Sequence, residues 1–260
     1  MTTHAPPRPV GSLLREWRER RRLSQLDLAL QAEVSTRHLS YLETGRSRPT
    51  AQMILRLSEH LDVPLRERNQ LLLAGGFAPA YPENAVDSPE VAQVMSALRA
   101  VLDGHAPCPA VVVDRWWDLV DANSAVTPLL DRCAPHLLEP PVNVLRMTLH
   151  PEGVAPRIRN LPQWRSHLLE QLLHRARALQ DDRLLALHEE LSALPGGSDP
   201  APPRGQVVVP LVLEHDGQVL SLFSIASVVR TATDVTVSEL VVETFYPSDE
   251  ATGAWLRAQA

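Results

Sequence analysis

The chain contains no lysine and little cysteine: all 25 basic residues are arginine, and Cys108 and Cys133 are the two cysteines among 260 residues. Neither cysteine lies in a CxxC pair or has a histidine at metal-ligand spacing. The sequence therefore predicts no cysteine-based metal site, and both thiols are expected to be buried. The arginine bias, together with 23 prolines, is typical of a GC-rich genome.

Long apolar runs are also missing. No segment approaches the roughly 20 apolar residues that span a bilayer, and the first residues, MTTHAPPRPV, carry prolines where a signal peptide would have an apolar stretch. With 44% hydrophobic and 22% charged residues, the composition is that of a globular protein. We expect a cytoplasmic protein of two modest domains that does not contact membranes.

Motifs of familiar enzyme classes are absent as well. The sequence has no GxSxG, HExxH, Walker A or GxGxxG pattern, and its ten histidines are scattered without a metal-ligand pair. His167 and His174 share one face of a predicted helix, but no carboxylate-rich motif accompanies them, and a surface position is expected. These observations predict a protein that is not an enzyme and has no catalytic residues, metal or cofactor.

Charge is divided unequally along the chain. Residues 1–76 hold 12 arginines against 8 acidic residues, a net charge of +4, whereas residues 77–260 hold 13 against 23, a net charge of −10. Such asymmetry indicates a basic part that faces DNA, joined to an acidic part with another task.

The basic part has the pattern of five short helices. Amphipathic spacing predicts the first helix over residues 12–22. The second and third begin after the N-cap residues Ser24 and Ser35 and are joined by a very short turn. We expect residues 11–76 to form an all-α domain, followed by a linker over the proline-containing residues 77–87.

Residues 88–260 mix helical and strand patterns. PAVVVDRWWDLVDAN resembles a hairpin, QVVVPLVLEH and QVLSLFSIASVV flank the turn dipeptide Asp216-Gly217, and VSELVVETFYP is predicted to be a further strand. Helices are predicted from Ser88 to about residue 103 and over residues 142–149, 160–179 and 182–194. We expect an α+β domain in which helices cover one face of an antiparallel sheet of about five strands.

The second and third helices supply the parts of a helix-turn-helix, which needs one helix in the major groove and another that braces it against the phosphates. Gln25 can donate to a phosphate at the start of the second helix. Arg37 can pair with guanine through two hydrogen bonds, worth about 1–3 kcal/mol of discrimination. The candidate DNA contacts are Gln25, Ser35, Thr36, Arg37, Ser40, Tyr41, Arg46 and Arg48.

An ordinary structural explanation exists for each of these residues. Ser35 would then act only as a helix cap, Thr36 and Ser40 would be solvated, and the arginine-rich segment 18–22 would be an exposed helix face.

The pattern as a whole is more specific than its single residues. SQLDLALQAEVSTRHLSYLETGRSRPT resembles the helix-turn-helix of the Xre/Cro family of bacterial and phage repressors, over residues 11–65. This resemblance implies a λ-repressor-like fold in which Gln25 touches phosphate and Thr36, Arg37 and Tyr41 face the bases. Glu33 stands where these turns often carry glycine, so the turn either avoids a positive φ or tolerates one at some cost.

The acidic part also has a resemblance. The stretches PAVVVDRWWDLVDAN and PPVNVLRMTLHPEGVAPRIRNLPQW, followed by a long helix and an antiparallel sheet, resemble the MmyB-like subgroup of Xre regulators. The resemblance implies a PAS-like sensing fold that binds a small ligand, for which a fatty-acid-like molecule is one candidate.

A sheet of this kind with helices on one face encloses an apolar cavity that bulky side chains can line, although core packing is their commoner role. Arginine suits a carboxylate head group. Alternatively, Asn143 caps the helix that contains Arg146, and His150-Pro151 simply ends it. The candidate ligand-binding residues are Trp117, Asn143, Arg146, Met147, His150, Arg157, Trp164, Phe223 and Phe245.

The leading hypothesis is a homodimeric regulator that binds palindromic double-stranded DNA and whose operator affinity a small apolar or fatty-acid-like ligand changes. In the alternative, the C-terminal domain is a protein-interaction module without a small-molecule ligand. A DNA-modifying enzyme would need a catalytic constellation that the sequence does not contain.

Overall fold

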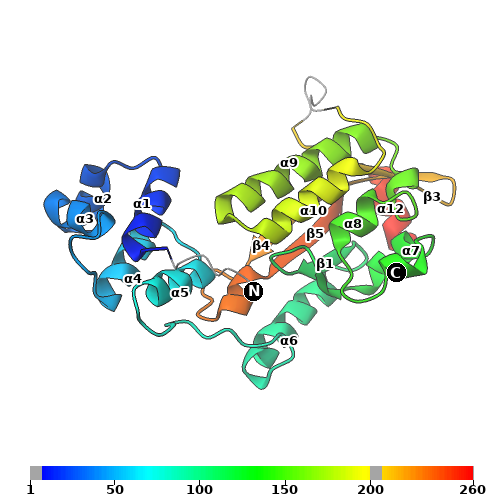
Figure 1. The fold of residues 1–260 in the computed structure, drawn as a ribbon. Coiled ribbons are helices and arrows are strands. Elements are labelled where there is room, and N and C mark those ends of the chain that lie inside the picture. The colour runs from blue at the N-terminus through cyan, green and yellow to red at the C-terminus, as the bar shows by residue number, and fades with distance from the viewer. Residues whose placement is uncertain (1–7, 200–206, 260) are drawn as a thin grey trace, which may run out of the picture. The chain divides into compact units, whose positions relative to one another are not determined.

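The computed structural model describes residues 8–199 and 207–259 (Figure 1). The chain divides into two compact units, Met1–Asn84 with Thr231–Ser238, and Ala85–Arg230 with Glu239–Ala260. These boundaries differ from the expected ones, because part of the predicted linker and a segment of the predicted second domain belong to the first unit. Among the described residues, no helix has the length and apolar character needed to cross a membrane.

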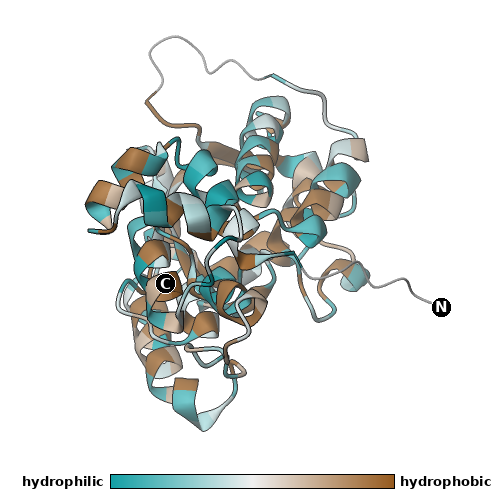
Figure 2. Ribbon diagram, turned by 60° about the vertical axis from the view of Figure 1, so that its left-hand side comes forward, coloured by the Kyte–Doolittle hydropathy of each residue, from teal (hydrophilic) through white to brown (hydrophobic). Residues whose placement is uncertain are grey.

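The first unit contains the predicted bundle of five helices. A buried cluster made mostly of leucines holds them together, and side chains of Ser24, Ser35 and Thr50 cap three of their N-termini. The hydrophobic and hydrophilic stretches that alternate along the ribbons in Figure 2 are typical of helices that bury one face. The helices are α1 (Val10–Arg20), α2 (Gln25–Gln31), α3 (Thr36–Glu43), α4 (Ala51–His60) and α5 (Leu65–Ala74).

The turn between α2 and α3 tolerates a positive φ. Glu33 has φ +50°, and the N–H of Val34 still reaches the carbonyl of Ala29 at 2.9 Å. The Glu33 carboxylate accepts a hydrogen bond from Arg56 at 2.8 Å. The left-handed conformation that glycine adopts without strain is therefore occupied here by a residue with a side chain.

Side chains tie two further segments into the first unit. Asn69 accepts a hydrogen bond from the N–H of Tyr81 at 3.1 Å and donates one to its carbonyl at 2.7 Å. Asp234 accepts from the backbone and the side-chain N–H of Asn84, at 3.1 and 2.9 Å. These bonds explain why the chain after α5 and the segment Thr231–Ser238 are grouped with the bundle.

The second unit is built on an antiparallel sheet with the strand order β2-β1-β5-β4-β3, five strands among the described residues. The β3–β4 hairpin turns at Asp216 and Gly217, whose φ values of +47° and +75° suit a type I′ turn. The α+β prediction is thus confirmed. The strands are β1 (Ala110–Val113), β2 (Leu119–Ala122), β3 (Leu211–His215), β4 (Gln218–Val228) and β5 (Val241–Pro247).

Helices cover both faces of this sheet, where the sequence analysis expected one (Figure 1). Helix α6 (Pro89–Gly104) packs Leu98 and Leu102 against Ala110 and Val112 of β1. On the opposite face lie α8 (Val144–Leu149), α9 (Leu161–Leu179) and α10 (Asp182–Ala193). Short helices α7 (Thr127–Leu130) and α12 (Glu250–Ala258) complete the unit.

One strand prediction was too long. The segment VSELVVETFYP was expected to be a strand throughout, but its first residues belong to α11 (Val235–Glu239) and β5 begins only at Val241. The Asp234 carboxylate accepts a hydrogen bond from the N–H of Val237 at 3.1 Å, which favours a helical turn over an extended chain. Cys108 and Cys133, expected to be buried, are half-buried free thiols.

Candidate DNA-binding face and ligand cavity

Helix α3 has one face in the core and the opposite face toward solvent. Leu39 and Leu42 are buried, and the Ser35 side chain accepts a hydrogen bond from the N–H of His38 at 3.1 Å. Ser35 therefore caps the helix, as predicted. The residues expected to face the bases, Thr36, Arg37, Ser40 and Tyr41, are exposed or half-buried.

Two arginines lie against the ring of Tyr41. The Nε atom of Arg37 donates to the Tyr41 hydroxyl at 2.9 Å, and the guanidinium groups of Arg37 and Arg46 lie 5.3 and 5.9 Å from the ring centroid. Such cation–π contacts limit the conformations of both arginines. Arg48, like Arg37 and Arg46, is exposed, and none of the three arginines forms an ion pair with a carboxylate among the described residues.

A buried ion pair joins the end of α3 to α1. Arg18 donates to both carboxylate oxygens of Glu43, at 2.7 and 2.9 Å, and to the carbonyl of Leu23 at 2.7 Å. The exposed fractions of the two charged side chains are 9% and 1%. Gln25 donates one of its two side-chain amide N–H bonds to Glu43 at 2.8 Å.

Sequence reasoning missed this pair. Arg18 lies in the arginine-rich segment 18–22, whose ordinary explanation was an exposed helix face, yet it is buried, and hydrogen bonding to Glu43 raises its pKa. The available signal was the neighbour Trp17 on the apolar face of α1, together with an acidic residue at the end of α3.

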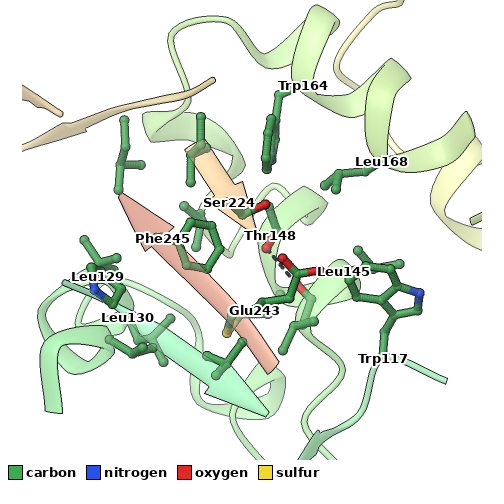
Figure 3. Close-up of a pocket in the computed structure, with 18 of the residues that line it drawn as sticks. Trp117, Leu129, Leu130, Leu145, Thr148, Trp164, Leu168, Ser224, Glu243 and Phe245 are labelled. Carbon is green, nitrogen blue, oxygen red and sulfur yellow. Dashed lines mark hydrogen bonds between the residues drawn. The ribbon is translucent and has the colours of Figure 1, made fainter. Parts of the chain in front are cut away.

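The second unit contains an apolar cavity between the sheet and α8 and α9. Its volume is about 120 Å³. Figure 3 shows Ser224, Glu243 and Phe245 on the strands beneath Trp164, with Leu129 and Leu130 at one side. The other lining residues are Pro109, Val111, Trp117, Val126, Val144, Leu145, Met147, Thr148, Val154, His167, Leu168, Gln171, Leu211 and Leu213.

A larger chamber of about 670 Å³ adjoins this cavity along α9, β4 and β5. We call the residues that line both spaces the throat. Each throat side chain has a hydrogen-bonding group, whereas the rest of the cavity lining is apolar except for Thr148. The throat residues are Trp117, Trp164, His167, Gln171, Ser224 and Glu243.

The structure brings together the apolar candidates and not the polar ones. Trp117, Met147, Trp164 and Phe245 line the cavity, and Phe223 lines only the chamber. The remaining candidates, Asn143, Arg146, His150 and Arg157, line neither space.

The polar candidates are engaged elsewhere. The Asn143 side chain caps α8 by accepting from the N–H of Arg146 at 3.1 Å, and Arg146 forms a double hydrogen bond with Glu190 at 2.5 and 2.7 Å. The Arg157 guanidinium donates to the carbonyl of Leu129. Asn143 and Arg146 also line a separate pocket of about 220 Å³ together with Glu190, and their predicted role in holding a ligand head group stays a prediction.

The throat residues Gln171, Ser224 and Glu243, and Arg175 of the chamber, were not among the candidates predicted from the sequence. Burial raises the pKa of Glu243, although a hydrogen bond from Ser224 and the charge of Arg175 act in the opposite direction. Burial lowers the pKa of Arg175, as does the neighbouring Arg115. Gln171 lies one turn from His167 on α9, with 3.0 Å between its amide nitrogen and the His167 Nε2 atom.

His167 was expected at the surface and instead lines the cavity. Burial lowers its pKa, which favours the neutral imidazole. The spacing of Trp164, His167, Gln171 and Arg175 along α9 was a sequence signal for one shared helix face.

Trp117 adopts an unusual backbone conformation at the throat. Its φ is +67°, a left-handed value that is an outlier for a bulky residue. The Asp114 carboxylate accepts from the N–H groups of Trp116 and Asp118, at 2.8 and 2.9 Å, and thereby shapes the turn that carries Trp117. Strain of this kind clusters at ligand sites.

One histidine pair does exist, contrary to the expectation from sequence. The rings of His136 and His150 lie 5.6 Å apart, and possible ligand atoms of both residues and Glu152 lie within 4.8 Å of one another. However, the Nδ1 atom of His150 accepts a hydrogen bond from the N–H of Glu152 at 3.1 Å. In the neutral imidazole a hydrogen bond accepted at Nδ1 puts the ring proton on Nε2, so a metal bound here would compete with the Glu152 N–H for the Nδ1 lone pair.

The fold and the two sites define a transcription regulator with a helix-turn-helix and a separate ligand-binding domain. The helix-turn-helix family matches residues 14–68, and the family described as MmyB-like transcription regulator ligand binding domain matches residues 94–258. The chain belongs to this MmyB-like family. Both matched families are regulator domains and neither is an enzyme family. A search of curated proteins finds no match.

Proposed function

We propose that the protein is a homodimeric regulator whose affinity for a palindromic operator changes when a small apolar ligand enters the cavity beneath α9. The observation that carries this proposal is the cavity itself, which is apolar apart from Thr148 and the throat. A volume of about 120 Å³ is about ten times the roughly 10–15 Å³ that one water needs. A chain-like ligand of about ten heavy atoms therefore fits, which agrees with the fatty-acid-like class that the family resemblance implies.

On the DNA side, Thr36, Arg37, Ser40 and Tyr41 contact base edges in the major groove. Their support is the exposed face of α3 and the ordered Arg37–Tyr41 pair at 2.9 Å. The backbone of the operator is bound by Gln25, Ser35, Arg46 and Arg48, which lie at the ends of the helices or just beyond them. Phosphate contacts position the protein, and base contacts select the sequence.

Dimerisation follows from the size of the recognition surface. One α3 helix reads a single half-site, and such a contact is seldom tight enough alone. A dimer with two-fold symmetry places two recognition helices about 34 Å apart on successive major-groove faces of a palindrome.

Ligand binding changes DNA affinity through the segment that connects β4 and β5. Val228 and Val241, paired at the ends of these strands, line the chamber. The segment between them, Thr231–Ser238, is part of the DNA-binding unit. Glu239, which directly follows this segment, accepts a hydrogen bond from the buried Arg115 at 2.6 Å. A ligand that favours one arrangement of these strand ends acts directly on a segment of the DNA-binding unit.

A protein-interaction module remains the second candidate for the C-terminal domain. Native mass spectrometry of the purified chain distinguishes the two. Extra mass that is released on denaturation supports the ligand, whereas a chain of unliganded mass that captures no apolar compound supports the interaction module.

The central test is fluorescence anisotropy with the upstream intergenic DNA of the gene and a scrambled duplex, at near-physiological salt. The proposal expects binding to the native duplex to be at least about a hundredfold tighter. It also expects a stoichiometry of two chains per duplex. Equal affinity for both duplexes, or one chain per duplex, would contradict the proposed operator recognition.

A further inference from the structure

Half of strand β4 has a neighbouring strand on one side only. Strand β3 pairs with β4 from Gln218 as far as Leu222, and β5 pairs with it from Leu222 to Val228. Over residues 223–228, the edge of β4 that faces away from β5 is therefore free of any strand that the structure describes. Residues 224–228 are all exposed, although β4 lies between two strands in the sheet order.

The alternation of hydrogen bonds in an antiparallel ladder shows which backbone groups face this free edge. Phe245 of β5 donates its N–H to Pro109, on the β1 side, so the preceding residue, Thr244, bonds to its partner Ile225 on β4. Alternate residues of β4 then direct their N–H and C=O groups to the free edge, where they make no hydrogen bond to the described residues. These residues are Ser224, Ala226 and Val228.

The free edge lacks the features that usually prevent strand pairing. Natural edge strands are protected by charged side chains, by proline or by a bulge. The segment FSIASVV, residues 223–229, contains neither a charged residue nor a proline, and its register with β5 is continuous. The apolar residues Ile225 and Val228 are 47% and 57% exposed. Unpaired backbone groups beside exposed apolar side chains are typical of an edge that accepts another strand.

A second copy of the same chain suits this edge by symmetry. An antiparallel pair of identical strands is self-complementary about a two-fold axis, as the interface of a homodimer must be. With Ala226 opposite its own copy, Ser224 lies opposite Val228 of the partner subunit. Three residues on each strand then exchange both of their bonds, about six hydrogen bonds in all. A typical protein interface contains roughly ten.

Length and charge also favour a second copy. The pairing begins beyond Leu222, which β3 already occupies, and stops where β4 itself ends at Val228, so the two strands fit without displacing a neighbour. Residues 207–209, which precede β3, line the chamber and do not pair with β4. Residues 77–260 carry a net charge of −10, which opposes association of two copies, but the paired segment has no charge of its own.

We infer that two copies of the chain dimerise by antiparallel pairing of their free β4 edges, centred on Ala226, which joins the two sheets into one. The inference rests on the proposed homodimer and names its interface. Ser224, Ala226 and Val228 also line the chamber, and opposite residues of paired strands place their side chains on the same face. The partner subunit therefore extends the chamber wall, and a ligand in the chamber lies against the dimer interface.

Disulfide trapping tests the register of the pair. The two Ala226 residues are expected about 5.5 Å apart at Cα, within the range of roughly 4.4–6.8 Å that a disulfide spans. Ala226→Cys should therefore form a covalent dimer on mild oxidation, seen on non-reducing gels and lost on reduction. The matched control is Ser227→Cys, because Ser227 is also exposed but lies opposite the partner's Ile225. Its yield should be at least fivefold lower, near the wild-type background from Cys108 and Cys133.

Sedimentation equilibrium measures how much the edge contributes to dimerisation. Ala226→Pro removes the N–H at the centre of the pair without taking a hydrogen bond from β5, and should raise the dissociation constant of the dimer at least tenfold. The control, Val219→Pro, places proline on the same strand outside the free edge. The N–H of Val219, like that of Ser221, which donates to Thr252, points away from β3. This control should stay within threefold of wild type, and circular dichroism verifies that both variants are folded.

The outcomes separate this interface from the homodimer itself. A dimer that Ala226→Pro leaves intact, or equal trapping of the two cysteine variants, would overturn the β4 interface while the homodimer stands. A chain that is monomeric both free and on the upstream duplex would refute the homodimer together with its interface. Slow hydrogen exchange at the amides of residues 224, 226 and 228 in dilute monomer would show that the same chain covers the edge, and would also overturn the inference.

Discussion

Replacing Arg18 by methionine tests the most specific energetic feature of the DNA-binding unit. The substitution keeps an apolar stem of similar length but removes three hydrogen bonds, two to Glu43 and one to Leu23. Glu43, whose side chain is 1% exposed, then keeps the amide of Gln25 as its one hydrogen-bond partner among the described residues. Breaking a buried pair in this way costs about 3–5 kcal/mol, because a charge is left buried and uncompensated.

Peptide-resolved hydrogen exchange measures this cost inside the full chain. A loss of about 1.4 kcal/mol of opening free energy lowers the protection factor about tenfold. The amides of α1 and α3 in Arg18→Met should therefore lose protection by a factor of roughly 100 to 5,000. The matched control is Arg15→Met on the same helix, because Arg15 pairs with Glu19 at 2.8 Å on the exposed face. We expect no measurable change there.

A second variant distinguishes lost charge pairing from lost packing. Arg18→Met combined with Glu43→Met removes both charges, and apolar replacement of a complete buried pair is often neutral. The double variant should therefore recover most of the protection that the single variant loses. The reasoning would be refuted if the amides of α1 and α3 in Arg18→Met kept protection within fivefold of wild type. It would also be refuted if the double variant showed no more protection than the single one.

Three further predictions concern the two sites. Arg37→Ala should relax base preference at one operator position in a binding selection, and an unchanged consensus would remove Arg37 from the base contacts. Arg48→Ala should weaken all duplexes alike and make the slope of log K against log salt shallower by about 0.9, whereas a sequence-selective effect would argue against a phosphate contact. Because burial raises the pKa of Glu243 above its ordinary value of 4.5, the folded state holds that proton to higher pH than the unfolded state. Its stabilising contribution is present below pH 4.5 and is lost as the pH rises through the raised value. The denaturation midpoint of the wild type should therefore fall relative to Glu243→Gln as the pH is raised, and parallel curves would mean that Glu243 titrates normally.

Local chemistry explains what was predictable. The capping side chains of Ser24 and Ser35 start α2 and α3 where the sequence expects them, and Asp216-Gly217 forms the expected hairpin turn. Helix caps and hairpin turns are formed by residues within a few positions of one another, so a short stretch of sequence is enough to predict them. Part of the apolar cavity lining was also predictable, since Trp117, Met147, Trp164 and Phe245 are bulky residues of the kind that line a cavity between sheet and helices.

The sequence by itself determined the five-helix bundle and the antiparallel sheet, because helix caps, turns and hydrophobic periodicity are set by neighbouring residues, and its resemblance to known regulators indicated the class of protein. Only the tertiary structure decided which polar side chains meet. Arg18 forms hydrogen bonds with Glu43, which lies 25 positions further along the chain. Arg146, which the sequence suggested as a ligand contact, forms hydrogen bonds with Glu190, 44 positions away. The packing of whole helices and strands determines which residues meet over such separations. Because a buried charge is costly, burial then favours a group that is paired or neutral.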